Sequence, residues 1–140
     1  IIPFAFRGEL FSGTHNFASG GDSFKIALYT SIAAFSTAST TYITANEVSS
    51  GGGSGYTTTG QVLGSQAVAS GTAVASVDFA DSTISNATFS AAGAAIYNDD
   101  KSDKLCVVLD FGGSKTATNG TFTIAFPDPS TPANAIISMS

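Results

Sequence analysis

The chain has 140 residues, which is the length of one domain, and only ten acidic and five basic side chains. Its fraction of charged residues is about half that of an ordinary soluble protein, in which roughly 25% of residues are charged. The five cations lie mostly far apart and the net charge is −5, whereas a phosphate backbone needs clustered Lys or Arg, so we expect no nucleic-acid partner. No apolar stretch reaches the roughly 18–20 residues that span a bilayer, and no basic region followed by an apolar run opens the chain, so we expect neither membrane insertion nor an intact signal peptide.

The N-terminal segment 3–11 is rich in large apolar side chains. These are Phe4, Phe6, Leu10 and Phe11. Their spacing fits a short amphipathic helix roughly, Pro3 suits its first turn, and Gly8 weakens it. The segment packs on its own domain or forms an arm on a neighbouring subunit. We therefore divide the chain into an N-terminal arm or short helix, 1–21, and a β-sandwich domain, 22–140.

The first strand is predicted at 24–29, where Phe24, Ile26 and Leu28 alternate with smaller or polar residues. Ser, Thr, Gly and Ala dominate the following stretch, 31–71, which we interpret as a long loop. Its short β-prone pieces are 41–44, 56–59 and 61–63. A Gly/Ser run at 50–55 resembles a flexible linker, but no second core of comparable size precedes it, so it is not a domain boundary.

The second half of the chain carries clearer strand patterns. Strands are predicted at 73–79, 82–89, 93–97, 105–111, 122–126 and 135–139. The segment 105–111 is apolar almost throughout, so we expect it in the middle of a sheet or sandwich with both faces covered. Cys106 within it has no partner in the chain and is expected to be a small core residue. The polar segment 98–104 predicts a hairpin loop, and Pro127 ends the strand before it.

About eight or nine short strands with regular turns and almost no helix predict an all-β fold. We expect a single β-sandwich with a short N-terminal helix or arm. The strand count favours a jelly-roll-like topology, and an immunoglobulin-like topology is the alternative. No internal repeat of fixed period is visible, which disfavours a solenoid or propeller.

Few residues carry chemistry. His15 is the single histidine, and a catalytic triad needs it beside a nucleophile and an orienting carboxylate. Its neighbours Thr14 and Asn16 look like a turn, so we expect a turn or local hydrogen-bond role. Glu9 and Glu47 are the only glutamates, and the sequence indicates no pair of acids suited to glycoside hydrolysis.

The acidic loop that holds Asp99, Asp100 and Asp103 has oxygen ligands of the kind that Ca²⁺ binds. It lacks the glycine and terminal Glu of an EF-hand loop, and Lys101 and Lys104 reduce its negative field. A solvated hairpin tip is the better interpretation. We therefore predict no enzyme, and no catalytic, cofactor-binding or metal-binding residues.

Several segments resemble small structural proteins of tailed bacteriophages. The similar segments are 11–17, 22–30, 42–48, 55–57, 94–98 and 107–112. The resemblance implies a virion component, specifically a capsid decoration or cement protein on the outer surface of the major capsid protein shell. A phage tail or neck structural protein is the alternative within this class. A secreted carbohydrate-binding or adhesive β-module that uses its tyrosines is the alternative outside it, although the chain has no Trp.

The function predicted is therefore attachment to, and stabilisation of, the major capsid protein shell, with self-association as a dimer or trimer. Two regions are candidates for the contact, the Phe-rich N-terminal segment and the long loop at 36–60, since both can order when a partner covers them. The candidate interface residues are Phe4, Phe6, Leu10, Phe11, Tyr42 and Tyr56.

Overall fold

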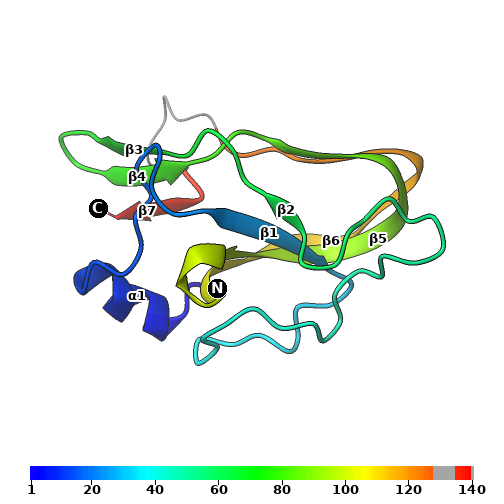
Figure 1. Ribbon diagram of the computed structural model, residues 1–140, viewed down its shortest axis with the longest axis horizontal. Helices are drawn as coiled ribbons and strands as arrows, with labels where there is room; N and C mark the ends of the chain where they lie inside the picture. Colours follow the sequence, from blue (N-terminus) through cyan, green and yellow to red (C-terminus); the bar gives the residue numbers. More distant parts are fainter. Residues whose placement is uncertain (128–134, 140) are drawn as a thin grey trace.

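The computed structural model describes residues 1–127 and 135–139. It is mostly β, with 45% strand and 8% helix, and its strands form two antiparallel sheets after a short N-terminal helix (Figure 1). The elements in chain order are α1 (Phe4–Phe11), β1 (Phe24–Tyr29), β2 (Gln61–Val62), β3 (Ala67–Ser70), β4 (Ala75–Asp78), β5 (Ser82–Asn98), the 3-10 helix η1 (Asp99–Lys101), β6 (Lys104–Ile124) and β7 (Ile137–Met139). The prediction of an all-β chain with a short helix at its start is confirmed.

The first sheet has the order β2-β1-β5-β6 and the second the order β3-β4-β7. Strands β5 and β6 form one long hairpin through η1, as the polar segment 98–104 predicted. The segments 82–89 and 93–97, predicted as separate strands, are one continuous strand. Gly112 and Gly113 have φ angles of 73° and 146° where the β5–β6 register shifts. The paired strands curve round at the right of Figure 1 and run back across the molecule, as bulged strands do at the corner of a sandwich.

The apolar run 105–111 lies at the edge of the first sheet and not in its middle, because β6 is the last strand in the order. Its faces are nonetheless covered, with Cys106 and Val107 in the main core and Val108 in a smaller cluster. The Val108 N–H donates to the Ile1 carbonyl at 2.8 Å, which covers the strand's outer edge there. An apolar run indicates that both faces of its strand are covered, but it does not indicate how many strands pair with that strand.

The stretch between β1 and β2 is a long loop, as predicted, and of its three β-prone pieces the last, 61–63, contains the strand β2. The pieces 41–44 and 56–59 are not strands, and Thr41 makes an isolated bridge to Lys104. Strand β3 was not predicted, because its Ala-Val-Ala-Ser sequence lacks an alternation of large apolar side chains.

One hydrophobic core joins the helix and both sheets. Phe6 of α1, Ile26 of β1 and Phe122 of β6 belong to it together with Val77 and Ile137 of the second sheet. The helix is therefore part of the same packed unit as the sheets.

Candidate interaction surface

Helix α1 is apolar on two faces. It begins after Pro3, whose φ of −61° suits a helix start. Phe6 and Leu10 lie four residues apart and face inward, and Phe6 is 1% exposed. Phe4 and Phe11 lie seven residues apart on another face and are 62% and 92% exposed. The residues that the structure describes cover only the first of these faces.

The exposed face is held in a fixed position. The N-terminal ammonium of Ile1 donates to the Val108 carbonyl at 2.7 Å, and the Phe4 N–H donates to the Thr37 carbonyl at 2.9 Å. The Arg7 guanidinium lies over the Phe4 ring, 5.2 Å from its centroid. Phe4 is therefore presented by an anchored helix, which would lose little freedom when a partner binds.

A series of hydrogen-bonded polar side chains, here called the polar chain, connects α1 to the hairpin of β5 and β6. Glu9 accepts from Lys104 Nζ at 2.7 Å, and its other oxygen lies 2.8 Å from His15 Nε2. The Asn98 amide Nδ2 donates to His15 Nδ1 and to Asp22 Oδ2, both at 2.9 Å. Because Nδ1 accepts from an amide, the network assigns the proton of the neutral ring to Nε2, which donates to Glu9. Both ring nitrogens are thereby occupied by structural partners.

The two carboxyl groups of this polar chain are stabilised in their charged form. Burial by itself raises the pKa of Glu9, and the hydrogen bonds from Lys104 and His15 outweigh it, so the pKa lies below its ordinary value. Burial likewise opposes ionisation of Asp22, but the Asn16 N–H and the Asn98 amide hold its pKa low. Both carboxylates therefore add to the attachment of α1 at neutral pH.

The long loop is anchored by a second polar group centred on Glu47. Its carboxylate accepts from Tyr42 Oη at 2.5 Å, Tyr56 Oη at 2.6 Å and the Thr59 N–H at 2.8 Å. The Tyr42 ring stacks on Tyr97 with centroids 4.8 Å apart. These tyrosines fasten the loop to the first sheet.

The structure separates the six predicted interface residues into three groups. Phe6 and Tyr56 lie in the interior, and Leu10 and Tyr42 are partly buried. Phe4 and Phe11 are exposed. The apolar character of the N-terminal segment was visible in the sequence, but the face that each side chain occupies depends on packing. The surface that these residues can offer to a partner is centred on the exposed face of α1.

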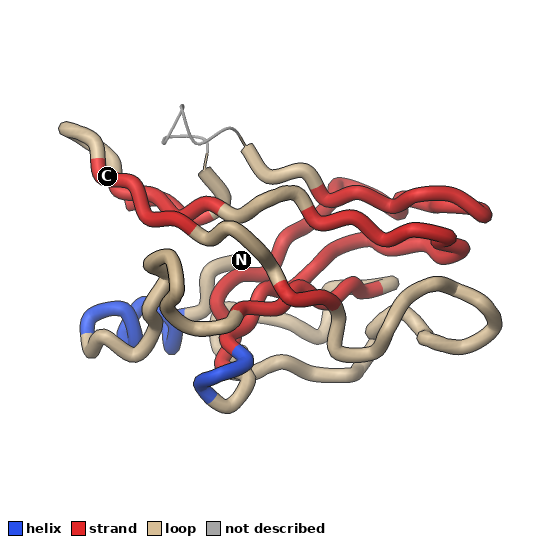
Figure 2. The backbone as a smooth tube through the Cα atoms, turned by 45° about the horizontal axis from the view of Figure 1, so that its top comes forward, coloured by secondary structure: helices blue, strands red, loops and turns tan. Residues whose placement is uncertain are grey.

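A groove of about 410 Å³ lies between the end of α1 and the second sheet. Leu10 of α1, Phe17 of the loop that follows it, and Val68, Val77 and Met139 of the second sheet are among its lining residues. Figure 2 shows the second sheet and α1 at the same end of the molecule. The sequence did not indicate this groove, because β3, which supplies one wall, was not predicted.

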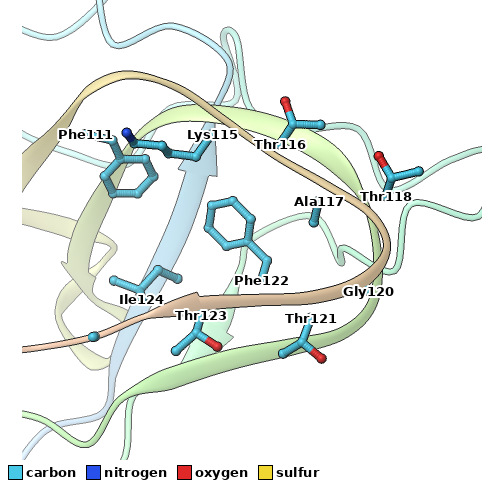
Figure 3. Close-up of a pocket in the computed structure, with 11 residues that line it drawn as sticks. Phe111, Lys115, Thr116, Ala117, Thr118, Gly120, Thr121, Phe122, Thr123 and Ile124 are labelled. Atoms are coloured by element: carbon cyan, nitrogen blue, oxygen red, sulfur yellow. The ribbon is translucent and has the colours of Figure 1, made fainter.

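A larger groove of about 550 Å³ opens inside the curl of β5 and β6 (Figure 3). Phe111 and Phe122 lie within it, with ring centroids 6.3 Å apart, and Lys115 and threonines form its rim. Asn119 in this part of β6 has a φ of 48°, next to a register shift in the pairing with β5. Such a bulge makes the strand edge a poor template for pairing with another strand.

The acidic loop is exposed at its tip, as predicted, but two of its three carboxylates are engaged within the chain. Asp99 lies 3.2 Å from Lys25 Nζ, and Asp100 accepts from the Ser23 N–H at 2.7 Å. Among residues 1–127 and 135–139, no three His, Cys, Asp or Glu side chains gather as a metal site would require. None of the helices that the structure describes is long and apolar enough to cross a membrane.

Comparison of the chain with protein-family models, with curated proteins and with solved structures gave no match in any of the three.

Proposed function

We propose that this chain is a non-enzymatic structural protein that attaches to a larger protein assembly through the exposed face of α1. The observation that carries the proposal is the distribution of its eleven Phe side chains. Nine are buried or half-buried, and the two exposed ones, Phe4 and Phe11, share one face of one anchored helix. A helix that is apolar on more than one face is normally covered on each of them.

The energetics suit attachment at many equivalent sites. Full burial of one Phe side chain contributes about 1.5–3 kcal/mol, so two of them only partly offset the loss of translational and rotational freedom on binding. A single attachment is therefore weak, and binding to a lattice of repeated sites is strengthened by multivalency when copies also contact one another. A surface with few charges reduces the desolvation cost of that contact.

The more specific proposal is that the assembly is a virion. In it, the chain is a capsid decoration or cement protein on the outer capsid surface, and its partner is the major capsid protein. The resemblance of several segments to phage structural proteins supports this, as does the size of the chain. The two sheets share one core, which supports interpreting them as the layers of a β-sandwich, with the curl of β5 and β6 as a corner.

Binding to capsid shells that lack the protein tests the proposal. Phe4→Ser combined with Phe11→Ser should weaken binding by roughly tenfold or more while leaving the thermal transition in place, because both side chains are exposed. Val62→Ser is the matched control, since Val62 is 63% exposed on β2. If the double variant bound as tightly as the wild type, the proposed contact surface would be rejected. Recovery of the protein only in tail or neck fractions would reject the capsid placement.

A further inference from the structure

The residues that the structure describes cover only part of the inner face of the second sheet. The strand register places Val68 opposite Val77 and Val77 opposite Ile137, so these three side chains form one row on one face. Met139 lies two residues after Ile137 and points to the same side. Val77 and Ile137 are 9% and 6% exposed, whereas Val68 and Met139 are 56% and 59% exposed. The face that packs on the core therefore continues into the groove beside α1, where the described residues leave it uncovered.

The groove has room for an aromatic ring, and its described walls contain no Asp, Glu, Lys or Arg. A cavity of about 150 Å³ holds a benzene molecule, and this groove measures about 410 Å³. Apart from His15, whose ring nitrogens are engaged with Glu9 and Asn98, the described lining residues include no titratable side chain. Two copies that each carry a net charge of −5 can therefore meet at this groove without placing like charges opposite one another.

The most exposed large apolar side chain of the described residues, Phe11, is the last residue of α1, at the end of the helix that borders the groove. Leu10, its neighbour in α1, lines the groove wall. A protruding side chain next to a socket on the same surface suits a two-fold pair, in which each copy both gives and receives the same contact. A protrusion and a socket on opposite faces would instead produce an open chain of subunits.

We infer that a second copy of this chain occupies the groove, with the Phe11 ring of each copy inserted between α1 and the second sheet of the other. The inference rests on the proposed assembly role of α1. It assigns the Phe11 end of the exposed helix face to the second copy and leaves Phe4 for the larger assembly. An aromatic side chain buries about 150–250 Å². The two rings, together with Val68 and Met139 of both copies, thus form a contact whose buried area is at the small end of the range for specific interfaces. A buried area of this size suits a reversible dimer.

Sedimentation equilibrium of the full chain, from micromolar to millimolar concentration and without capsid shells, tests the inference. We expect the wild type to dimerise reversibly, and we expect Phe11→Ser and Val68→Asp each to weaken dimerisation by roughly tenfold or more. Val62→Asp is the control for Val68→Asp, because both valines lie on short strands with similar exposure. A monomeric wild type, or a Val62→Asp variant as defective as Val68→Asp, would overturn the inference.

Mixing the two defective variants tests the reciprocal geometry. Phe11→Ser keeps an intact groove and Val68→Asp keeps an intact Phe11, so a mixed pair retains one of the two insertions, whereas each variant paired with itself retains none. The mixture should therefore dimerise more strongly than either variant alone, and equal weakness of the mixture would reject insertion of Phe11 into this groove.

Shell binding separates the inference from the proposed function. Phe4→Ser should reduce shell binding and leave the dimer unchanged. A dimer that persists without shell binding would reject the function alone, and shell binding by a wild type that never dimerises would reject the inference alone.

Discussion

The attachment of α1 depends on Asn98, and the variant Asn98→Ala measures how much. This side chain is 0% exposed and makes three hydrogen bonds, two from its amide nitrogen to His15 and Asp22 and one from the Asp100 N–H to its oxygen. A hydrogen bond between neutral groups contributes about 0.5–1.5 kcal/mol and one to a charged group about 1.5–3 kcal/mol. The substitution also leaves His15 Nδ1 buried without a donor. We therefore expect a loss of about 3–5 kcal/mol.

Urea denaturation gives the free energy of unfolding directly, and the expected loss corresponds to a fall in Tm of roughly 10–20 °C for a chain of this size. Ser90→Ala is the comparison, since it removes a single exposed hydrogen bond of 2.6 Å to Thr116. We expect that variant to lose about 0.5 kcal/mol or less. Hydrogen exchange at the α1 amides should accelerate only in Asn98→Ala. If both variants lost the same small free energy, the polar chain would not anchor the helix.

Three further predictions concern acid, thiol chemistry and the backbone. Because the pKa values of Glu9 and Asp22 are lowered in the folded state, their stabilising contribution is complete above the ordinary values of 4.5 and 3.8 and is lost as the pH falls through the lower folded values. The urea midpoint should therefore fall on acidification below about pH 4.5, and less steeply in Glu9→Gln; an unchanged slope would contradict this. Burial raises the pKa of the Cys106 thiol, so a thiol reagent at neutral pH should react with this thiol only at the rate of unfolding. Rapid labelling of the folded chain would contradict this and show that the thiol is accessible. Gly60 and Gly13 have φ angles of 79° and 69°, but a Cβ would lie 2.0 Å from the Ile26 carbonyl oxygen at Gly60 and in open space at Gly13. Gly13→Ala should thus cost about 1–2 kcal/mol of backbone strain and Gly60→Ala clearly more, and equal losses in urea denaturation would refute the predicted clash.

The proposed function places most of the chain in a supporting role. The polar chain around His15 fixes α1, and the Glu47 group fixes the long loop on the first sheet. Tyr56, a candidate for stacking on sugars in a secreted binding module, lies in the interior with its hydroxyl bound to Glu47. The surface that these arrangements leave open to a partner includes the exposed face of α1 and the groove beside it.

The sequence by itself determined several of the local elements. The alternation at 24–29 predicted β1, Pro3 and the apolar spacing after it predicted α1, and the polar segment 98–104 predicted the turn between β5 and β6. Each of these features depends on residues close together in the chain, whose backbone preferences and side-chain spacing act without a partner from elsewhere. The near absence of helix followed from the same patterns.

Only the tertiary structure decided which surfaces are covered. His15 and Asn98 are 83 residues apart, and the sequence contains no signal that pairs them. The edge position of the run 105–111 depends on Ile1 and the long loop covering β6, and the groove depends on α1 and β3 lying around the same hollow. Phe6 and Phe11 are the same residue type in the same helix, yet one is in the core and the other stands in solvent. The physical reason is that burial is a property of contacts between distant segments, which a local pattern of apolar residues does not specify.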